Sequence, residues 1–237
     1  MSRLPETSQR DIDRVRREHP DWGAWRTAKE LGFNVQQVRW YLQQQEKQAV
    51  ESPDPFRVYV WDIETAGLST DIGFLMMASF LDLHTGVMVT ERMASHEQEP
   101  TWTLDEAELD VLLRVRKILE GAVVLIGHNS VSFDKCYVNG VSAKHGLPPV
   151  GKKIHLDTYL AARYGFKGRL QSNKLSNLAD FFGLGVKDHP PKADWRSAHG
   201  RDEDALARLQ VRCESDVRLT ALVWDRMRPH YLDWRGK

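Results

Sequence analysis

The fold follows from residues 58–65, Val58-Tyr59-Val60-Trp61-Asp62-Ile63-Glu64-Thr65. Their β-branched and aromatic side chains predict a strand, in which residues two apart point to the same face of the sheet. Asp62 and Glu64 therefore project together from the end of an apolar strand. Two adjacent carboxylates repel each other unless a cation lies between them, which is how a divalent-metal site is assembled. Alone, an Asp-x-Glu pair at a strand end more often marks a solvated turn.

Strands and helices alternate after this stretch. FLMMASFLDL at 74–83 and GVMVTERM at 86–93 predict a hairpin, and the spacing of apolar residues predicts a helix over 103–121. AVVLIGHN at 122–129 is a continuous apolar run, typical of a strand buried on both faces. The remaining predicted elements are a strand at 154–157 and helices at 134–145, 158–164, 175–183 and 203–228. The predicted fold class is α/β, a mixed sheet flanked by helices.

Composition excludes several classes of protein. The 237 residues include 33 basic and 33 acidic ones, so net charge alone does not indicate a nucleic-acid partner. The two cysteines, Cys136 and Cys213, stand far apart, which excludes a zinc knuckle and a disulfide-rich fold and fits a reducing compartment. The apolar runs are too short to span a bilayer. We expect a protein of the cytoplasm.

The N-terminal segment has a different organisation. Two prolines in residues 51–55 predict a linker between residues 1–50 and 56–237. Residues 1–50 predict three helices, at 8–18, 22–31 and 35–46, with Gly32 ending the second and Asn34 capping the third. Their spacing resembles the helix-turn-helix of bacterial and phage regulators, which implies a bacterial or phage-encoded DNA-binding domain. The DNA-contacting residues would be Gln36, Gln37, Arg39 and Gln43. The alternative is a helical hairpin used for oligomerisation or docking.

Two further acids follow apolar elements. Asp134 ends the segment Gly127–Asp134, directly after the buried strand, and we expect Asn129 and Phe133 to form a turn that brings it back toward the first strand. Asp216 lies on the last predicted helix, where a single acid more often caps the helix or pairs with an arginine.

These acids occur in the order Asp-x-Glu, Asn-x-x-x-Phe-Asp and Asp-Val. In this order the sequence resembles the ribonuclease-H-like 3′→5′ exonucleases with four metal-binding acids, the DnaQ or DEDD superfamily. It is most similar to predicted exonucleases related to the proofreading domain of family B DNA polymerases. The resemblance extends over about residues 56–230 and includes His155-Leu156-Asp157-Thr158 and the segment Ser172–Leu178.

The resemblance implies a metal-dependent 3′→5′ exonuclease that releases nucleoside 5′-monophosphates from DNA by a two-metal mechanism. The ligands of two divalent cations, Mg²⁺ or Mn²⁺, would be Asp62, Glu64, Asp134 and Asp216. The substrate-binding residues would be Thr65, Asn129 and Lys174. An all-oxygen set of ligands suits these hard cations better than zinc.

One position departs from the family pattern. Members carry a tyrosine four residues before the last acid or a histidine five before it, where this chain has Arg212 and Val211. Arginine does not give up its proton at working pH and cannot act as a base. Arg212 and Asp216 share a helix face, so we expect the guanidinium near the metal centre. It would either donate to the scissile phosphate or merely pair with an acid.

The partner is expected to be DNA, with a single-stranded 3′ end at the active site and duplex at the N-terminal domain. A strip of basic residues favours a phosphate backbone, although a solvated surface patch is the other interpretation. RNA stays open, because the acids contact phosphate and metal rather than the 2′-hydroxyl. A rival function is a DNA-binding regulator with a weak or inactive nuclease fold, which Arg212 favours. The strip consists of Lys152, Lys153, Arg163, Lys167, Arg169 and Lys174.

Overall fold

The computed structural model describes residues 57–185 and 192–235 continuously. Nearer the N-terminus it describes residues 8–9, 11–12, 14–15, 24–35, 37–38 and 41. The chain divides into two compact units, Met1–Asp54 and Pro55–Lys237. The division lies inside the segment 51–55. Among the described residues, none of the helices has both the length and the apolar character needed to cross a membrane.

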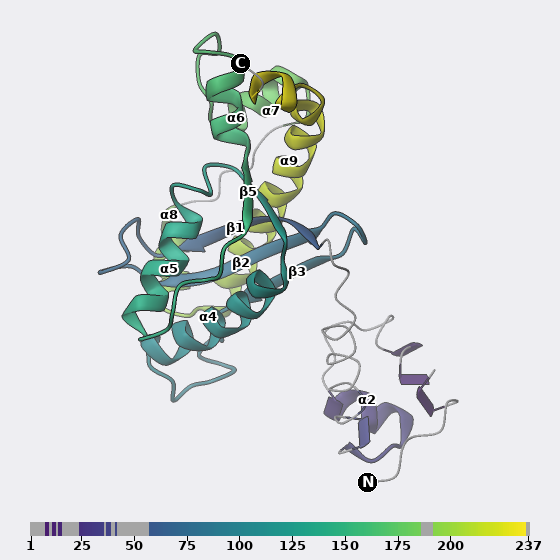
Figure 1. Ribbon diagram of the computed structural model, residues 1–237. Coiled ribbons are helices and arrows are strands. Elements are labelled where there is room, and N and C mark those ends of the chain that lie inside the picture. The colour runs from purple at the N-terminus through teal and green to yellow at the C-terminus, as the bar shows by residue number, and fades with distance from the viewer. Residues whose placement is uncertain are drawn as a thin grey trace. The chain divides into compact units, whose positions relative to one another are not determined.

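The five strands described in the second unit form one mixed sheet (Figure 1). Their order is β3-β2-β1-β4-β5; β1 and β3 each pair antiparallel with β2, whereas β4 pairs parallel with β1 and with β5. This is an α/β fold compatible with the ribonuclease-H-like class, and the predicted strands and hairpin are confirmed. The strands are β1 (Val58–Thr65), β2 (Leu75–Asp82), β3 (Met88–Arg92), β4 (Val124–Gly127) and β5 (Ile154–Asp157).

Helices cover both faces of this sheet. One helix was not predicted, α8, and the last one, α9, continues through Pro229 instead of ending at residue 228. Proline removes one backbone donor from a helix, but packing of Tyr231 against Trp224, with ring centroids 5.4 Å apart, holds the turn that follows it. The helices are α4 (Leu104–Gly121), α5 (Asp134–Lys144), α6 (Thr158–Gly165), α7 (Leu175–Phe182), α8 (Lys192–His199) and α9 (Glu203–Arg235).

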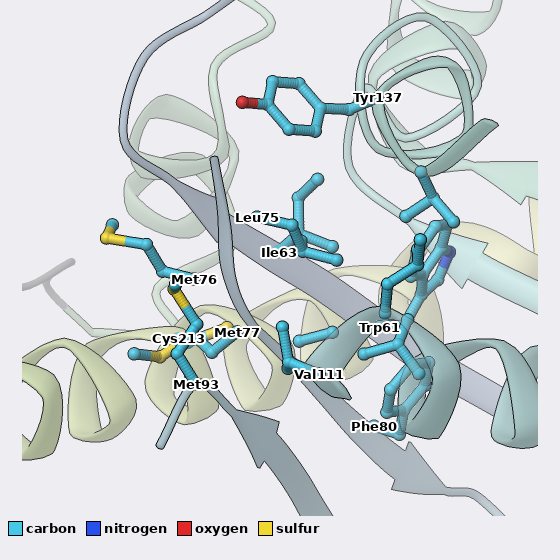
Figure 2. Packing of buried hydrophobic residues seen from close by; sticks show 14 of the residues in the cluster. Trp61, Ile63, Leu75, Met76, Met77, Phe80, Met93, Val111, Tyr137 and Cys213 are labelled. Carbon is cyan, nitrogen blue, oxygen red and sulfur yellow. The ribbon is translucent and has the colours of Figure 1, made fainter. Parts of the chain in front are cut away.

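The alternation of side chains along β1 gives the strand two different faces. Trp61 is buried in the main apolar cluster with residues of α4 and α5, and its ring stacks on Phe80 at 6.1 Å (Figure 2). Val60 packs on the opposite face against Val217 and other residues of α9. Asp62 and Glu64 follow Val60 at intervals of two, so they lie on the α9 face, as the period of the strand predicts.

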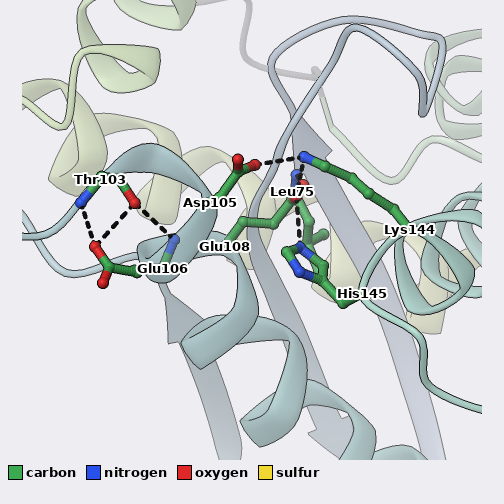
Figure 3. Close-up of polar contacts among 7 residues, drawn as sticks. All are labelled: Leu75, Thr103, Asp105, Glu106, Glu108, Lys144 and His145. Atoms are coloured by element: carbon green, nitrogen blue, oxygen red, sulfur yellow. Dashed lines mark hydrogen bonds and ion pairs between the residues drawn. The ribbon is translucent and has the colours of Figure 1, made fainter.

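A fully buried carboxylate joins three elements around β2 (Figure 3). Glu108 of α4 accepts the backbone N–H of Leu75 at 2.7 Å, while its other oxygen lies 2.8 Å from Lys144 Nζ and 3.0 Å from His145 Nε2. The charge and the hydrogen-bonding capacity of this buried group are therefore both satisfied. Glu108 ties the start of β2 and the end of α5 to α4.

We predict that Glu108→Ala lowers the free energy of unfolding by about 3–5 kcal/mol, because Lys144 and the Leu75 N–H lose a buried partner. Urea denaturation monitored by circular dichroism measures this loss. Asp105→Ala is the matched control, since Asp105 pairs with the same lysine but is 66% exposed. It should cost less than about 1 kcal/mol. Equal losses in the two variants would contradict the role assigned to Glu108.

The first unit contains helix α2 (Ala24–Leu31), which ends at Gly32 with φ +67°. Asn34 Oδ1 accepts the backbone N–H of Gln37 at 3.4 Å, so the predicted helix stop and cap are confirmed. Gln36, Arg39 and Gln43 lie outside the described residues. The helix-turn-helix and its DNA contacts stay predictions. The described buried side chains that pack together in this unit are Ile12, Ala28, Val38 and Tyr41.

Candidate active site

Three carboxylates meet where β1 ends beside α9. Asp62, Glu64 and Asp216 each offer one oxygen, and these atoms lie within 4.8 Å of one another. Glu64 and Asp216 are buried, whereas Asp62 is partly exposed. Oxygen ligands at this spacing, with one side open, fit a hard divalent cation such as Mg²⁺ or Mn²⁺.

Arg212 contacts two of the three carboxylates. Its Nε donates to Glu64 Oε1 at 2.9 Å, and a terminal nitrogen lies 3.3 Å from Asp216 Oδ2. The side chain is only 14% exposed, so the guanidinium charge is largely withdrawn from solvent. Desolvation opposes this charge, but Glu64 and Asp216 outweigh it and raise the pKa of Arg212. Arg212 therefore stays cationic and compensates part of the negative charge of the carboxylates.

Trp195 of α8 completes the surroundings of Glu64. Its indole Nε1 donates to Glu64 Oε2 at 3.2 Å, and the Arg212 guanidinium lies 5.2 Å from its ring centroid. The ring therefore holds Arg212 by a cation–π contact and Glu64 by a hydrogen bond. Burial raises the pKa of Glu64 in spite of the lowering effect of Arg212.

Asp134 lies next to β1 but outside the group of three acids. Its Oδ1 accepts the backbone N–H of Ile63 at 3.0 Å. Because β1 pairs with β4 only over Val58–Val60, this N–H has passed the end of the neighbouring strand. Asp134 thus accepts the hydrogen bond that a neighbouring strand would otherwise accept from Ile63, the residue between Asp62 and Glu64.

The turn that delivers Asp134 depends on unusual backbone. Asn129 adopts a left-handed conformation with φ +62°, and its carbonyl accepts the N–H groups of Ser132 and Phe133 at 3.2 and 3.0 Å. A Cβ on Gly127, two residues before Asn129, would lie 2.3 Å from Ser130 Oγ, so this position has room only for glycine. This turn brings Asp134 back toward the first strand, as expected from the sequence.

Asp157 holds the same turn from the other side. Its two oxygens accept the backbone N–H groups of Asn129 and Val131, both at 3.0 Å. Oδ1 also caps α6 by accepting the N–H groups of Tyr159 and Leu160 at 2.9 and 3.1 Å. The sequence offered a signal for this positioning role, an acid directly before a helix, but Asp157 was not assigned one.

A pocket of about 440 Å³ adjoins the carboxylate cluster at Arg212. Two predicted substrate residues, Asn129 and Lys174, line it. The third does not: Thr65 is 8% exposed, and its hydroxyl donates to the Gly67 carbonyl at 2.7 Å. The remaining lining residues were not predicted; they are His128, Tyr159, Leu175 and Ser176.

No protein-family model matches this chain, and no curated protein matches it in sequence. Among solved structures, the chain is similar to the family B DNA polymerase from the hyperthermophilic archaeon Pyrobaculum calidifontis, with a TM-score of 0.57 and 18% sequence identity. The similarity covers 75% of this chain and 25% of the polymerase chain. It shows a shared α/β fold, and this chain spans about a quarter of the polymerase it matches.

Burial changes the ionisation of Asp134. The side chain is 2% exposed, and desolvation raises its pKa to about 7, aided by the nearby Asp157 and Glu64 and opposed by backbone N–H groups. The folded protein therefore keeps this proton to a higher pH than the unfolded chain does. Stability that depends on the proton is fully present below about pH 4 and is lost as the pH rises to about 7.

We predict that Asp134→Asn removes this loss, because the amide cannot ionise and can still accept the Ile63 N–H. In EDTA the variant and wild type should be about equally stable at pH 4, and the variant should be more stable at pH 8 by up to about 4 kcal/mol. Urea denaturation at a series of pH values measures the difference. Parallel stability curves for the two proteins would show that Asp134 ionises freely.

Arg212 is paired with carboxylate oxygens that a metal ion would need as ligands. We therefore predict that Arg212→Gln tightens Mn²⁺ binding at least about tenfold, a change of about 1.4 kcal/mol in binding free energy. The metal-free variant should lose about 3 kcal/mol of stability, because two buried carboxylates lose their cation. Isothermal titration calorimetry and urea denaturation measure the two effects. Arg208→Gln, one turn earlier on α9 and paired with Asp194, is the control and should bind Mn²⁺ like wild type. Unchanged or weaker Mn²⁺ binding by Arg212→Gln would refute the competition.

Proposed function

We propose that the protein is a metal-dependent 3′→5′ exonuclease that hydrolyses DNA from a single-stranded 3′ end to nucleoside 5′-monophosphates. The observation that carries this proposal is the meeting of Asp62, Glu64 and Asp216 within 4.8 Å of one another, beside a pocket lined by Lys174 and Arg212. The shared fold with a family B DNA polymerase supports a nucleic-acid substrate.

The three clustered acids would hold the divalent ions, with Asp134 beside them. Bound there, two such ions supply an activated water and stabilise the leaving 3′ oxygen. Asp134 would serve best as an anion, and its pKa of about 7 is raised by burial, so a nearby cation would favour the ionised form. The fold would keep the carboxylate oxygens close together and oriented toward the ions.

The pocket beside the cluster would hold the terminal nucleotide. Lys174 and Arg212 provide positive charge there, and Arg212 can donate two parallel hydrogen bonds to a phosphate once it leaves Glu64. His128 and Tyr159, whose rings lie edge to face at 5.8 Å, provide aromatic surface on which a base can stack. Arg212 would then stabilise charge that develops on the scissile phosphate.

A second function has one observation in its favour. Arg212 already pairs with both Glu64 and Asp216, and it cannot act as a base. This arrangement favours a DNA-binding regulator in which the nuclease fold turns over slowly or not at all. The N-terminal unit would supply the duplex contacts in either case.

We predict that the wild-type protein shortens 5′-labelled single-stranded DNA one nucleotide at a time from the 3′ end in Mg²⁺ or Mn²⁺, but not in EDTA. Asp62→Asn should lower the rate at least about 100-fold, because one of the clustered ligands loses its charge. Asp225→Asn, a 61% exposed position on α9, should leave the rate unchanged. Gel electrophoresis of labelled DNA and RNA oligonucleotides measures rate, direction and substrate class.

Binding of DNA without any metal-dependent shortening would favour the regulator. Shortening that persists undiminished in Asp62→Asn would place the reaction at another site, whereas faster degradation of RNA would change the substrate class and leave the site assignment intact.

A further inference from the structure

A second cavity, of about 280 Å³, lies on the other face of the sheet from the acids. Its lining includes Trp61 of β1, Leu125 of β4 and His155 of β5, which the strand registers place on one face. Trp61 and Asp62 are neighbours in β1 and point to opposite faces. The sheet therefore separates this cavity from the carboxylate cluster.

The floor of the cavity is apolar and its rim is basic. Trp61, Leu125 and Val138 are each 1% exposed and form part of the floor. Of the described residues that line the cavity, none is acidic, and three are lysines: Lys135, Lys152 and Lys153. Lys153 Nζ donates to the backbone carbonyl of Glu120 at 2.7 Å, an acceptor that carries no formal charge. An apolar floor below cationic side chains suits an anion with an apolar body.

Two buried nitrogens of the lining have no hydrogen-bond partner, Trp61 Nε1 and His155 Nδ1. Figure 2 shows the indole nitrogen of Trp61 at the outer edge of the drawn cluster. Buried polar atoms in native proteins nearly always have a partner, so an unpaired donor beside a cavity indicates a missing acceptor. Asn139 already uses its Oδ1 to accept the Val150 N–H at 3.0 Å, and can offer a ligand its amide NH₂ donor.

The volume limits the size of a ligand. A cavity of about 280 Å³ holds roughly nine waters at about 30 Å³ each, and a cavity of about 150 Å³ already admits benzene. One ring system fits inside this space, and a larger polar substituent, such as a sugar phosphate, would extend from it past the rim. A charged substituent would lie at the rim, where the lysines are.

We propose that this cavity is a binding site for a planar ring that bears an anionic group. The ring packs against Trp61 and Val138, a ring acceptor receives the Trp61 N–H, and the anion pairs with Lys135 and Lys152. Nucleoside 5′-monophosphates and heteroaromatic carboxylates both have this chemistry. The proposal is independent of the proposed nuclease activity, because none of the clustered acids takes part.

Nuclear magnetic resonance of the indole N–H groups tests the site directly. The chain has eight tryptophans, and Trp61→Phe identifies the Trp61 signal by its loss. The probes are thymidine 5′-monophosphate and quinoline-3-carboxylate, each titrated in EDTA, with inorganic phosphate as the probe that lacks a ring. We expect the Trp61 signal to shift saturably with at least one ring-bearing anion and not with phosphate, and the responding probe identifies the source of the ligand.

The lysines at the rim provide the second test. Lys152→Ala should weaken binding of the responding probe at least about fivefold, whereas Lys117→Ala, an exposed position on α4 outside the lining, should bind as wild type does. Both are surface variants that leave the core unchanged. A Trp61 signal that moves with neither ring-bearing anion, or that moves equally with phosphate, would overturn the proposal. Equal affinity of Lys152→Ala and wild type would also overturn it.

Discussion

The candidate site of the second unit depends on compensation of the repulsion between carboxylates that lie close together. Asp62, Glu64 and Asp216 place carboxylate oxygens within 4.8 Å of one another in a largely buried position. Such a cluster repels itself unless a cation compensates it. Arg212 supplies that cation, and Trp195 fixes both the guanidinium and Glu64. A metal ion bound by these carboxylates would therefore compete with Arg212 for the same oxygens, and its binding would depend on the position of one side chain.

Strand β1 serves the core and the site at once. Trp61 and Ile63 belong to the apolar cluster shared with α4 and α5, while Asp62 and Glu64 face α9. The backbone N–H of Ile63, near the end of this strand, donates to Asp134, and the turn before Asp134 is held by Asp157. The site is consequently supported by buried hydrogen bonds on the strand side and by an ion pair on the helix side.

Local sequence patterns predict much of this arrangement. The period of two places Asp62 and Glu64 on one face, and the apolar run at 122–129 predicts the buried strand that precedes Asp134. The contact of Arg212 with Asp216 follows from their spacing of four residues. By contrast, Glu64 meets Arg212 and Trp195 across 148 and 131 positions, and no local pattern encodes such contacts. The role of Thr65 in substrate binding stays a prediction, and its hydroxyl donates to the nearby Gly67 carbonyl.

Anomalous diffraction from a crystal soaked in Mn²⁺ tests the central claim, that the carboxylate cluster is a metal site at which Arg212 competes with the ion. We expect an anomalous peak for a Mn²⁺ ion that is coordinated by oxygens of Asp62, Glu64 and Asp216, and an Arg212 guanidinium that has moved away from Glu64. An Arg212 side chain that keeps both ion pairs, with no peak among the three carboxylates, would contradict it.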